Sequence, residues 1–258
     1  PDLSEWKRLV EKNKFLSDEI KIGIVGKYTE LRDSYISSME ALEHAGISQN
    51  VKVKIKLIHA KDISATDCEK LFGLDGILIP GGYGQRDAAG IIHAIRYARE
   101  NKIPFLGIGL GMQCALIEFT RNVMNRPEAD TAEFNSAAEM LLIEHITKPT
   151  NEKSLPKRKG AHPCKLNKNS LTFAAYNEEM IHERFCHLYK VNNFYRAELT
   201  NAGIIEAAVS EDGAHLEAFE LPKEMHPWFV GVQFHPELKS RITRPSPLVT
   251  AFVNACVL

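Results

Sequence analysis

The stretch that decides the fold is a short apolar run that ends in glycines and leads into a helical pattern. It reads Ile103-Pro104-Phe105-Leu106-Gly107-Ile108-Gly109-Leu110-Gly111-Met112-Gln113. This order predicts a strand, a sharp turn and a helix. A nucleophile elbow of the form Gly-x-nucleophile-x-Gly needs small residues on both sides, because strand and helix approach closely there. Gly107 and Gly111 hold the two small positions, and Gly109 stands where the nucleophile is expected.

The segments around this elbow alternate between apolar strands and helical patterns. Strands are expected at 20–26, 51–58, 76–80, 103–108, 140–146, 171–176, 204–209, 215–219 and 228–234, and helices at 3–14, 33–46, 87–101 and 245–257. The run at 76–80 is apolar without alternation, which is typical of a parallel strand covered on both faces. The sequence therefore predicts an α/β fold with a doubly wound, mostly parallel central sheet flanked by helices. Ligands of such sheets bind beyond the carboxyl ends of the strands.

Composition narrows the class of protein. With 258 residues and 44% hydrophobic composition, the chain is expected to form one large domain. Its 32 basic and 33 acidic residues give a net charge of -1, so we expect neither nucleic acid nor a membrane as a partner. The five cysteines include no Cys-x-x-Cys pair, which favours a cytoplasmic protein without a metal site. No apolar run approaches the ~20 residues of a membrane span.

The triplet His235-Pro236-Glu237 follows the last apolar strand pattern. In extended backbone, residues two apart point to the same face, so the Glu237 carboxylate is expected to hydrogen-bond one imidazole nitrogen of His235. Such a pair orients a general base and raises its basicity.

The turn Pro80-Gly81-Gly82 offers a backbone without side-chain obstruction. The N–H of Gly82 is a candidate donor to a developing oxyanion. A second candidate is the N–H of Leu110, at the start of the helix after the elbow, where the helix dipole favours negative charge.

Together these motifs resemble the class I glutamine amidotransferases, whose Cys-His-Glu site combines a Gly-x-Cys-x-Gly elbow with a distant His-Pro-Glu. Further motifs make the chain most similar to the glutaminase domains of CTP synthases. They are Gly26-Lys27-Tyr28, Pro80-Gly81-Gly82-Tyr83-Gly84-Gln85-Arg86, Thr131-Ala132-Glu133-Phe134, Tyr189-Lys190-Val191-Asn192 and His226-Pro227-Trp228-Phe229. The resemblance covers nearly the whole chain and implies a flavodoxin-like fold.

The resemblance also implies an activity. In this family a thiolate attacks the side-chain amide of L-glutamine, forms a γ-glutamyl thioester and releases ammonia, which a synthase domain uses for ATP-dependent amination of UTP to CTP. Residues 1–18 then correspond to an interdomain linker helix and 19–258 to the glutaminase domain. The synthase domain is absent from this chain, which does not begin with Met, so we expect part of a longer protein. The glutaminase domain itself needs no cofactor, whereas ATP, Mg, GTP and a homotetramer are implied for the full-length enzyme.

Carried over by position, the resemblance gives each site residue a role. Gly109 is at the position of the nucleophilic Cys, His235 is the general base and acid, and Glu237 orients it. The substrate-binding residues are implied to be Gly82, Leu110, Gln113 and Glu133. For Glu133 there is a physical reason, because a carboxylate pairs with the α-ammonium of glutamine.

Three departures from the family pattern stand out. The arginine that holds the substrate α-carboxylate is replaced by Leu188, and Arg184 is the nearest substitute in sequence. The Met-Arg-Leu-Gly segment is not evident around 160–164, which casts doubt on a GTP contact there. The third departure is Gly109, because glycine cannot form a thioester. Cys114 lies more than a helical turn away and is interpreted as a buried helix residue.

Several explanations of Gly109 remain open. The chain is a natural pseudoenzyme, an engineered variant that traps substrate, or a protein whose modified cysteine is recorded as glycine. A noncatalytic glutamine-binding or assembly module is therefore the alternative function. A dinucleotide-binding Gly-x-Gly-x-x-Gly is disfavoured because Met112 holds the third glycine position. The polar, basic segment 148–160 is a candidate lid or interdomain contact.

Overall fold

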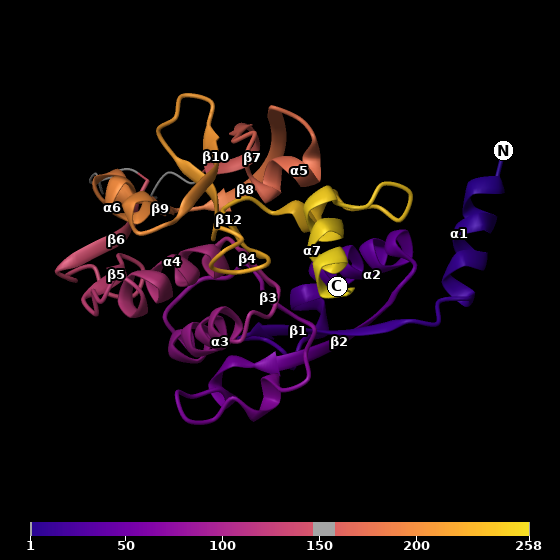
Figure 1. Ribbon diagram of the computed structural model, residues 1–258, viewed down its shortest axis with the longest axis horizontal. Helices are drawn as coiled ribbons and strands as arrows, with labels where there is room; N and C mark the ends of the chain where they lie inside the picture. The colour runs from indigo at the N-terminus through magenta and orange to yellow at the C-terminus, as the bar shows by residue number, and fades with distance from the viewer. Residues whose placement is uncertain (1, 147–157, 258) are drawn as a thin grey trace.

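The computed structural model describes residues 2–146 and 158–257 (Figure 1). Its centre is a nine-stranded sheet in the order β2-β1-β3-β4-β12-β11-β10-β7-β8. The strands are β1 (Glu19–Gly26), β2 (Lys52–His59), β3 (Gly76–Ile79), β4 (Phe105–Ile108), β7 (Arg158–Leu166), β8 (Met180–His187), β10 (Ile205–Ser210), β11 (Leu216–Glu220) and β12 (Phe229–Val232). A three-stranded sheet joins β5 (Ala129–Thr131), β6 (Met140–His145) and β9 (Tyr189–Val191).

The five strands at one end of the sheet order, β2, β1, β3, β4 and β12, run parallel to one another. Their order, 2-1-3-4 followed by β12, is that of a flavodoxin-like sheet with β12 as the fifth strand. Every residue of β3 and β4 is buried, in agreement with their apolar, non-alternating sequences. The predicted parallel core is confirmed. Beyond it, β11, β10, β7 and β8 continue the sheet in antiparallel fashion, an extension that the sequence patterns did not specify.

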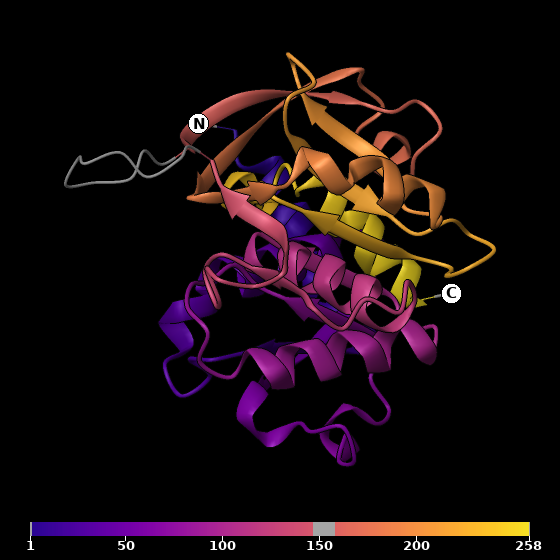
Figure 2. The ribbon, with the colours of Figure 1, turned by 90° about the vertical axis from the view of Figure 1, so that its left-hand side faces the viewer.

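Helices cover both faces of the parallel core. They are α2 (Ile36–Gln49), α3 (Ala88–Glu100), α4 (Leu110–Asn122) and α7 (Pro247–Val257), with two short helices, α5 (Leu171–Tyr176) and α6 (Arg196–Asn201), in the antiparallel half. Figure 2 shows α3 and α4 in front of the sheet and α7 behind it. On the α3 and α4 side, Phe105 and Phe229 stack with ring centroids 4.3 Å apart. On the other face, α2 and α7 pack on Leu78 and Leu106.

The first helix, α1 (Ser4–Lys14), lies at the edge of the molecule, away from the central sheet (Figure 1). It is tied to α2 by Lys12, whose Nζ donates a hydrogen bond to the carbonyl oxygen of Ser48 at 2.9 Å. The assignment of residues 1–18 to an interdomain linker stays a prediction. Within the described ranges, no helix combines the length and apolar character needed to cross a bilayer.

Two expected elements differ in the structure. Residues 171–176 were expected as a strand and form α5. The reason is at the helix start, where the Ser170 hydroxyl accepts from the N–H of Phe173 and the Glu220 carboxylate accepts from the N–H groups of Leu171 and Thr172. These bonds satisfy backbone donors that a helix terminus leaves unpaired. Helix α2 also continues beyond Gly46.

The glycines that flank the elbow are required by close approach. A Cβ on Gly107 would lie 2.8 Å from the carbonyl carbon and oxygen of Gly111. A Cβ on Gly111 would lie 2.4 Å from the carbonyl oxygen of Ile79, at the end of β3. Both contacts are with backbone, which cannot rotate away as a side chain can. The helix α4 can therefore start directly on top of the sheet only because these two positions carry no side chain.

Replacing Gly111 with alanine is expected to lower the free energy of unfolding by about 3 kcal/mol, because the new methyl group forces α4 away from β3. Gly82→Ala is the matched control. Its Cβ would meet Leu110 Cδ2 at an ordinary 3.6 Å, so a loss of under about 1 kcal/mol is expected. Urea unfolding of both variants measures the difference. Equal midpoints would contradict the steric explanation.

Candidate active site

A cavity of about 310 Å³ lies where the carboxyl ends of β3, β4 and β12 meet. It is lined by Tyr28, Ser34, Tyr35, Gly81, Gly82, Tyr83, Gly109, Leu110, Gln113, Glu133, Cys186, His187, Leu188, Tyr189, Gln233 and His235. The fold thus brings six sequence-predicted site residues to one cavity, as a parallel sheet of this topology predicts. The seventh, Glu237, lies behind His235.

Position 109 has the backbone of an elbow. Gly109 has φ 55° and ψ -108°, a conformation that L-residues rarely adopt, and its N–H donates to the carbonyl oxygen of Val232 at 2.7 Å. A Cβ built at this position would lie 3.7 Å from Nε2 and Cε1 of His235 and 3.6 Å from the Cα of Gly81. These are ordinary van der Waals distances. The site therefore has room for a side chain at 109, directed at the imidazole.

The imidazole is oriented by the carboxylate two residues on. Nδ1 of His235 lies 2.8 Å from Oε1 of Glu237, and both side chains are largely buried. The carboxylate accepts a hydrogen bond from the Nδ1–H group, so Nε2 is unprotonated and its lone pair faces position 109. The predicted pair is confirmed, but its expected cause is wrong. Pro236 begins a 3₁₀ turn over Pro236–Lys239, so the contact arises in a turn and not in extended backbone.

The candidate oxyanion donors lie side by side. Gly82 and Leu110 both line the cavity, and Leu110 is the first residue of α4, whose first N–H groups have no acceptor within the helix. The loop that carries Gly82 is held from below by Lys27, whose buried ammonium donates to the carbonyl oxygens of Tyr83 (3.1 Å) and Gly84. The Glu133 carboxylate accepts from the N–H of Gly84 at 2.6 Å.

Two buried amides face each other in the wall of the cavity. Nε2 of Gln113 donates to Oε1 of Gln233 at 3.0 Å, and both residues are nearly inaccessible to solvent. Oε1 of Gln113 and Nε2 of Gln233 have no hydrogen-bond partner among the described residues. A buried unsatisfied acceptor beside a buried unsatisfied donor is costly unless a ligand or water completes both. The pair therefore fits recognition of a carboxamide, which both donates and accepts, whereas a carboxylate has no proton to donate to Oε1 of Gln113.

The charged group of the cavity is Glu133. Burial raises the pKa of its carboxyl group, an effect that the nearby Lys27 ammonium partly offsets. The same burial lowers the pKa of Lys27, whose ammonium remains bonded to loop carbonyls. A ligand ammonium next to Glu133 would favour its ionised form. The position suits the α-ammonium contact that the sequence predicted for this residue.

The segment at 186–189 forms a further part of the cavity wall. Leu188 lines the cavity, whereas Arg184 is exposed and is not among the lining residues, so the sequence-based idea that Arg184 replaces the missing arginine finds no support. The carbonyl oxygen of Arg184 instead accepts from the N–H of His235 at 2.8 Å. Burial lowers the pKa of His187 to about 4, so this imidazole is neutral near pH 7.

Cys114 does not replace the missing nucleophile. Its side chain is fully buried in α4, and it is not among the residues that line the cavity. Burial raises the pKa of its thiol to about 12, so almost no thiolate is present at neutral pH. The interpretation of Cys114 as a buried helix residue is confirmed. Among the residues that the structure describes, no group of three or more His, Cys, Asp or Glu side chains could hold a metal ion.

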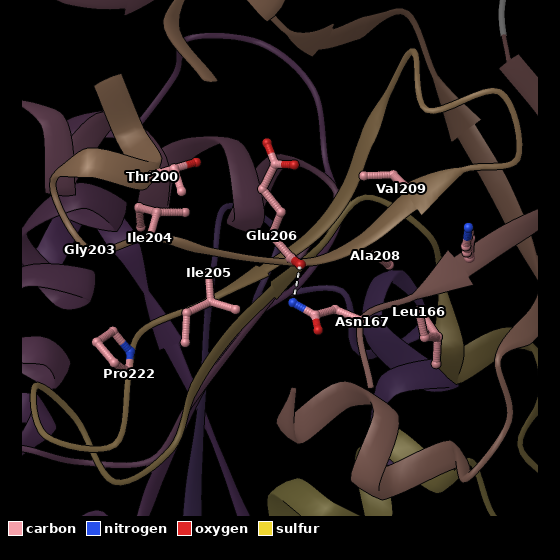
Figure 3. A pocket seen from close by; sticks show the side chains of 11 residues that line it. Leu166, Asn167, Thr200, Gly203, Ile204, Ile205, Glu206, Ala208, Val209 and Pro222 are labelled. Carbon is pink, nitrogen blue, oxygen red and sulfur yellow. Dashed lines mark hydrogen bonds between the residues drawn. The ribbon is translucent and has the colours of Figure 1, made fainter. Parts of the chain in front are cut away.

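A larger groove, of about 690 Å³, lies elsewhere, beside β10 (Figure 3). Its wall is mainly aliphatic, with Ile204, Ile205, Val209 and Pro222. Glu206 also lines this groove, and its carboxylate accepts hydrogen bonds from the Arg196 guanidinium at 2.6 and 2.7 Å. The groove gathers no nucleophile, base or oriented pair, so chemistry is placed in the smaller cavity.

Comparison with known proteins agrees with this geometry. The family model for Glutamine amidotransferase class-I matches residues 30–255, which is most of the chain. The chain belongs to the class-I glutamine amidotransferases. The predicted α/β, flavodoxin-like fold is therefore that of its family, and the sequence resemblance is confirmed.

Individual relatives narrow the family. The chain is 48% identical to a CTP synthase of Clostridium kluyveri over 257 residues and 46% identical to one of Bacillus cytotoxicus over 259 residues. The two alignments include 98% and 99% of this chain. The chain spans about half, 48%, of the length of either relative. The structure is similar to that of the glutaminase domain of Trypanosoma brucei CTPS, solved with bound acivicin, with a TM-score of 0.86 and 32% identity. The superposition covers 92% of this chain and 94% of the Trypanosoma brucei chain.

Several cavity residues had no role in the sequence-based site. Gln233 was the easiest of these to find from the sequence, because it is a polar residue inside the apolar run 228–234. Lys27 was visible as a charged residue directly after a buried strand, but nothing in the sequence showed which loop it holds. His187 and Cys186 gave no signal. The predicted lid at 148–160 lies mostly outside the described residues, which resume at residue 158.

Proposed function

We propose that this domain is a glutamine site of the CTP synthase type that binds L-glutamine but, with glycine at position 109, does not hydrolyse it. The observation that carries the proposal is at position 109. The elbow backbone, the oriented imidazole and the oxyanion donors surround a position whose Cβ would fit, and that position has no side chain. Everything that binds and polarises an amide is present, and the group that attacks it is not.

The proposed roles of the residues are those that the sequence resemblance implies, and their common position in one cavity supports them. Glu133 holds the α-ammonium of glutamine, and Gln113 contacts the bound substrate. The side-chain carbonyl oxygen then lies between the N–H groups of Gly82 and Leu110, which polarise it. With a cysteine at 109, the thiol would pass its proton to Nε2 of His235, attack the amide carbon and form the γ-glutamyl thioester. His235 would return the proton to the departing ammonia, and water would release glutamate.

The wider setting is part of the same proposal. The named relatives are CTP synthases about twice as long as this chain, which supports a synthase domain as its partner within a longer protein. The homotetramer that the sequence resemblance implies is part of the proposal. That domain would use ATP, Mg and ammonia to aminate UTP, with GTP as a regulator. In such a protein a glutamine-binding domain without turnover would sense glutamine or support assembly, and the synthase would draw on free ammonia.

Thermal unfolding with and without L-glutamine tests the proposal. For a dissociation constant on the order of 1 mM, 10 mM L-glutamine stabilises the folded state by about 1.4 kcal/mol and raises Tm by about 3 °C. D-Glutamine at the same concentration is the control for stereospecific binding. Glu133→Gln, which keeps the side-chain shape and removes its charge, should abolish the shift. Equal Tm values with either enantiomer would refute glutamine binding, and ammonia release by the unaltered chain would refute the lack of turnover.

A further inference from the structure

The lining of the cavity carries a negative group for the ammonium of an amino acid but no lysine or arginine for its carboxylate. L-Glutamine brings a carboxamide, an ammonium and a carboxylate. The carboxamide meets the N–H groups of Gly82 and Leu110, and the ammonium meets Glu133. Among the lining residues that the structure describes, no lysine or arginine is present to pair with the carboxylate.

Two cations that lie close to lining residues, Lys27 near Tyr83 and Arg158 near His187, are already engaged. Lys27 gives its ammonium to the carbonyl oxygens of Tyr83 and Gly84. Arg158 pairs with the buried carboxylate of Glu217 and lies over the Phe185 ring, 4.5 Å from its centroid. Turning either group toward a ligand would leave buried polar groups unpaired, which is unfavourable.

Arg86, a third cation, lies next to the lining residue Tyr28 and is also engaged. Its guanidinium donates to the carbonyl oxygen of Lys27 at 3.1 Å and lies 3.5 Å from a carboxylate oxygen of Asp87. It also lies over the Tyr28 ring, 4.7 Å from the centroid. Arg86 therefore covers Tyr28 and is not itself a lining residue.

The wall at 187–189 offers only neutral groups to a carboxylate. Leu188 presents an aliphatic side chain. The Nδ1 proton of His187 is donated to the carbonyl oxygen of Tyr189 at 2.6 Å, which leaves Nε2 as a buried acceptor without a described partner. An acceptor repels a carboxylate oxygen. A carboxylate brought to this wall would be partly desolvated without a countercharge, while the carboxylate of Glu133, which lines the same cavity, adds repulsion.

We propose that this pocket selects carboxamides that carry an ammonium group and no free carboxylate, and that Leu188 sets this selection. The proposal rests on the proposed function, because it assigns a ligand class to the same amide-binding site. It places L-glutamine among weak ligands and its α-amide, L-glutaminamide, among stronger ones. A domain with this selectivity responds to amidated or peptide-linked glutamine more than to the free amino acid.

Isothermal titration calorimetry of the unaltered chain with three compounds tests the selection. At pH 6.5 the α-ammonium of each amine ligand is charged. L-Glutaminamide is expected to bind at least about tenfold more tightly than L-glutamine, because its carboxylate is replaced by a neutral amide. 4-Carbamoylbutanoate, which keeps the carboxylate and lacks the ammonium, is expected to bind most weakly.

Substitutions at residue 188 test the assignment to Leu188. Leu188→Arg supplies the missing cation, so it should reverse the preference in favour of L-glutamine, whereas Leu188→Met should leave the preference unchanged. Circular dichroism confirms that each variant is folded, and the three-compound comparison on the unaltered chain stands if one is not. L-Glutamine binding as tightly as L-glutaminamide to the unaltered chain would overturn this inference and leave the proposed function intact. An unchanged preference in folded Leu188→Arg would overturn the role of Leu188. Binding of none of the three compounds would overturn both proposals.

Discussion

Replacing Gly109 with cysteine is expected to turn the domain into a glutaminase, with glutamine hydrolysis raised by a factor on the order of 10³ or more. The Cβ of the new side chain would lie 3.7 Å from Nε2 of His235, so the imidazole can accept the thiol proton. The resulting thiolate is the better nucleophile, and the N–H groups of Gly82 and Leu110, which both line the cavity, are the proposed donors to the tetrahedral oxyanion. Glutamate and ammonia release in a coupled assay measure the gain.

Gly109→Ala is the matched control for this gain. It adds the same Cβ at the same positive φ of 55°, and it carries no sulfur. Both variants are expected to lose about 1–2 kcal/mol of stability, because a side chain is strained in this backbone conformation. Only the cysteine variant should gain activity and acquire the mass of a thioester adduct with glutamine. A folded Gly109→Cys variant without turnover at saturating L-glutamine would contradict the proposed roles of His235 and the oxyanion donors.

Intact mass of the unaltered chain tests whether residue 109 is a modified cysteine. A mass that corresponds to glycine at 109 excludes a modified cysteine. The structure adds a physical point: the site is sterically prepared for a side chain at 109, whereas Gly107 and Gly111 admit none. The glycine at 109 is therefore not imposed by packing.

Glu237→Gln in the Gly109→Cys background is expected to lower kcat by about 10³- to 10⁴-fold. In the serine protease triad, the corresponding Asp-to-Asn change costs about 10⁴-fold because it favours the wrong tautomer. Here the glutamine amide would donate to Nδ1 of His235, which moves the imidazole proton to Nε2 and removes the lone pair that faces position 109. KM should change little, because Glu237 does not line the cavity. Steady-state kinetics separates the two constants.

Glu220→Gln serves as the matched control for this substitution. Glu220 is also a buried carboxylate, but it accepts from the N–H groups of Leu171 and Thr172 at the start of α5, away from the cavity. The glutamine amide has one oxygen and can accept only one of these two bonds, so some stability is lost, but kcat should stay within about threefold of the parent because the change lies away from the cavity. An equal loss of kcat in both variants would show that Glu237 acts through overall stability and not through His235.

Much of the fold was readable from short-range patterns. Non-alternating apolar runs marked β3 and β4, and helical periodicity marked α3 and α4, because the burial of these elements follows directly from local side-chain order. The strand predicted at 171–176 failed because its conformation is decided by Glu220, 44 or more residues away, whose carboxylate caps the helix. Strand β8 gave a weak pattern because two of its buried positions are held by the polar residues Glu183 and His187, so apolar side chains do not alternate regularly with polar ones.

The residues of the candidate site also fall into those that local motifs predicted and those whose roles depend on distant contacts. Gly82, Gly109, Leu110 and His235 were predicted from local motifs, since an elbow, a glycine turn and a strand end each carry their geometry in adjacent residues. Lys27 and Gln233 could not be assigned, because their roles depend on contacts with Gly84 and Gln113, which lie 57 and 120 positions away in the chain.

By itself, the sequence determined the elbow, the presence of a mostly parallel core and the absence of a nucleophile at position 109, because each is a property of residue type and near-neighbour spacing. Only the tertiary structure decided that position 109 has room for a side chain beside Nε2 of His235 and that Leu188 faces a cavity without a lysine or arginine among its described lining residues. The physical reason is that steric room and charge balance in a cavity depend on side chains from at least six separate segments. Their distances are set by how the sheet and helices pack, and no local pattern encodes them.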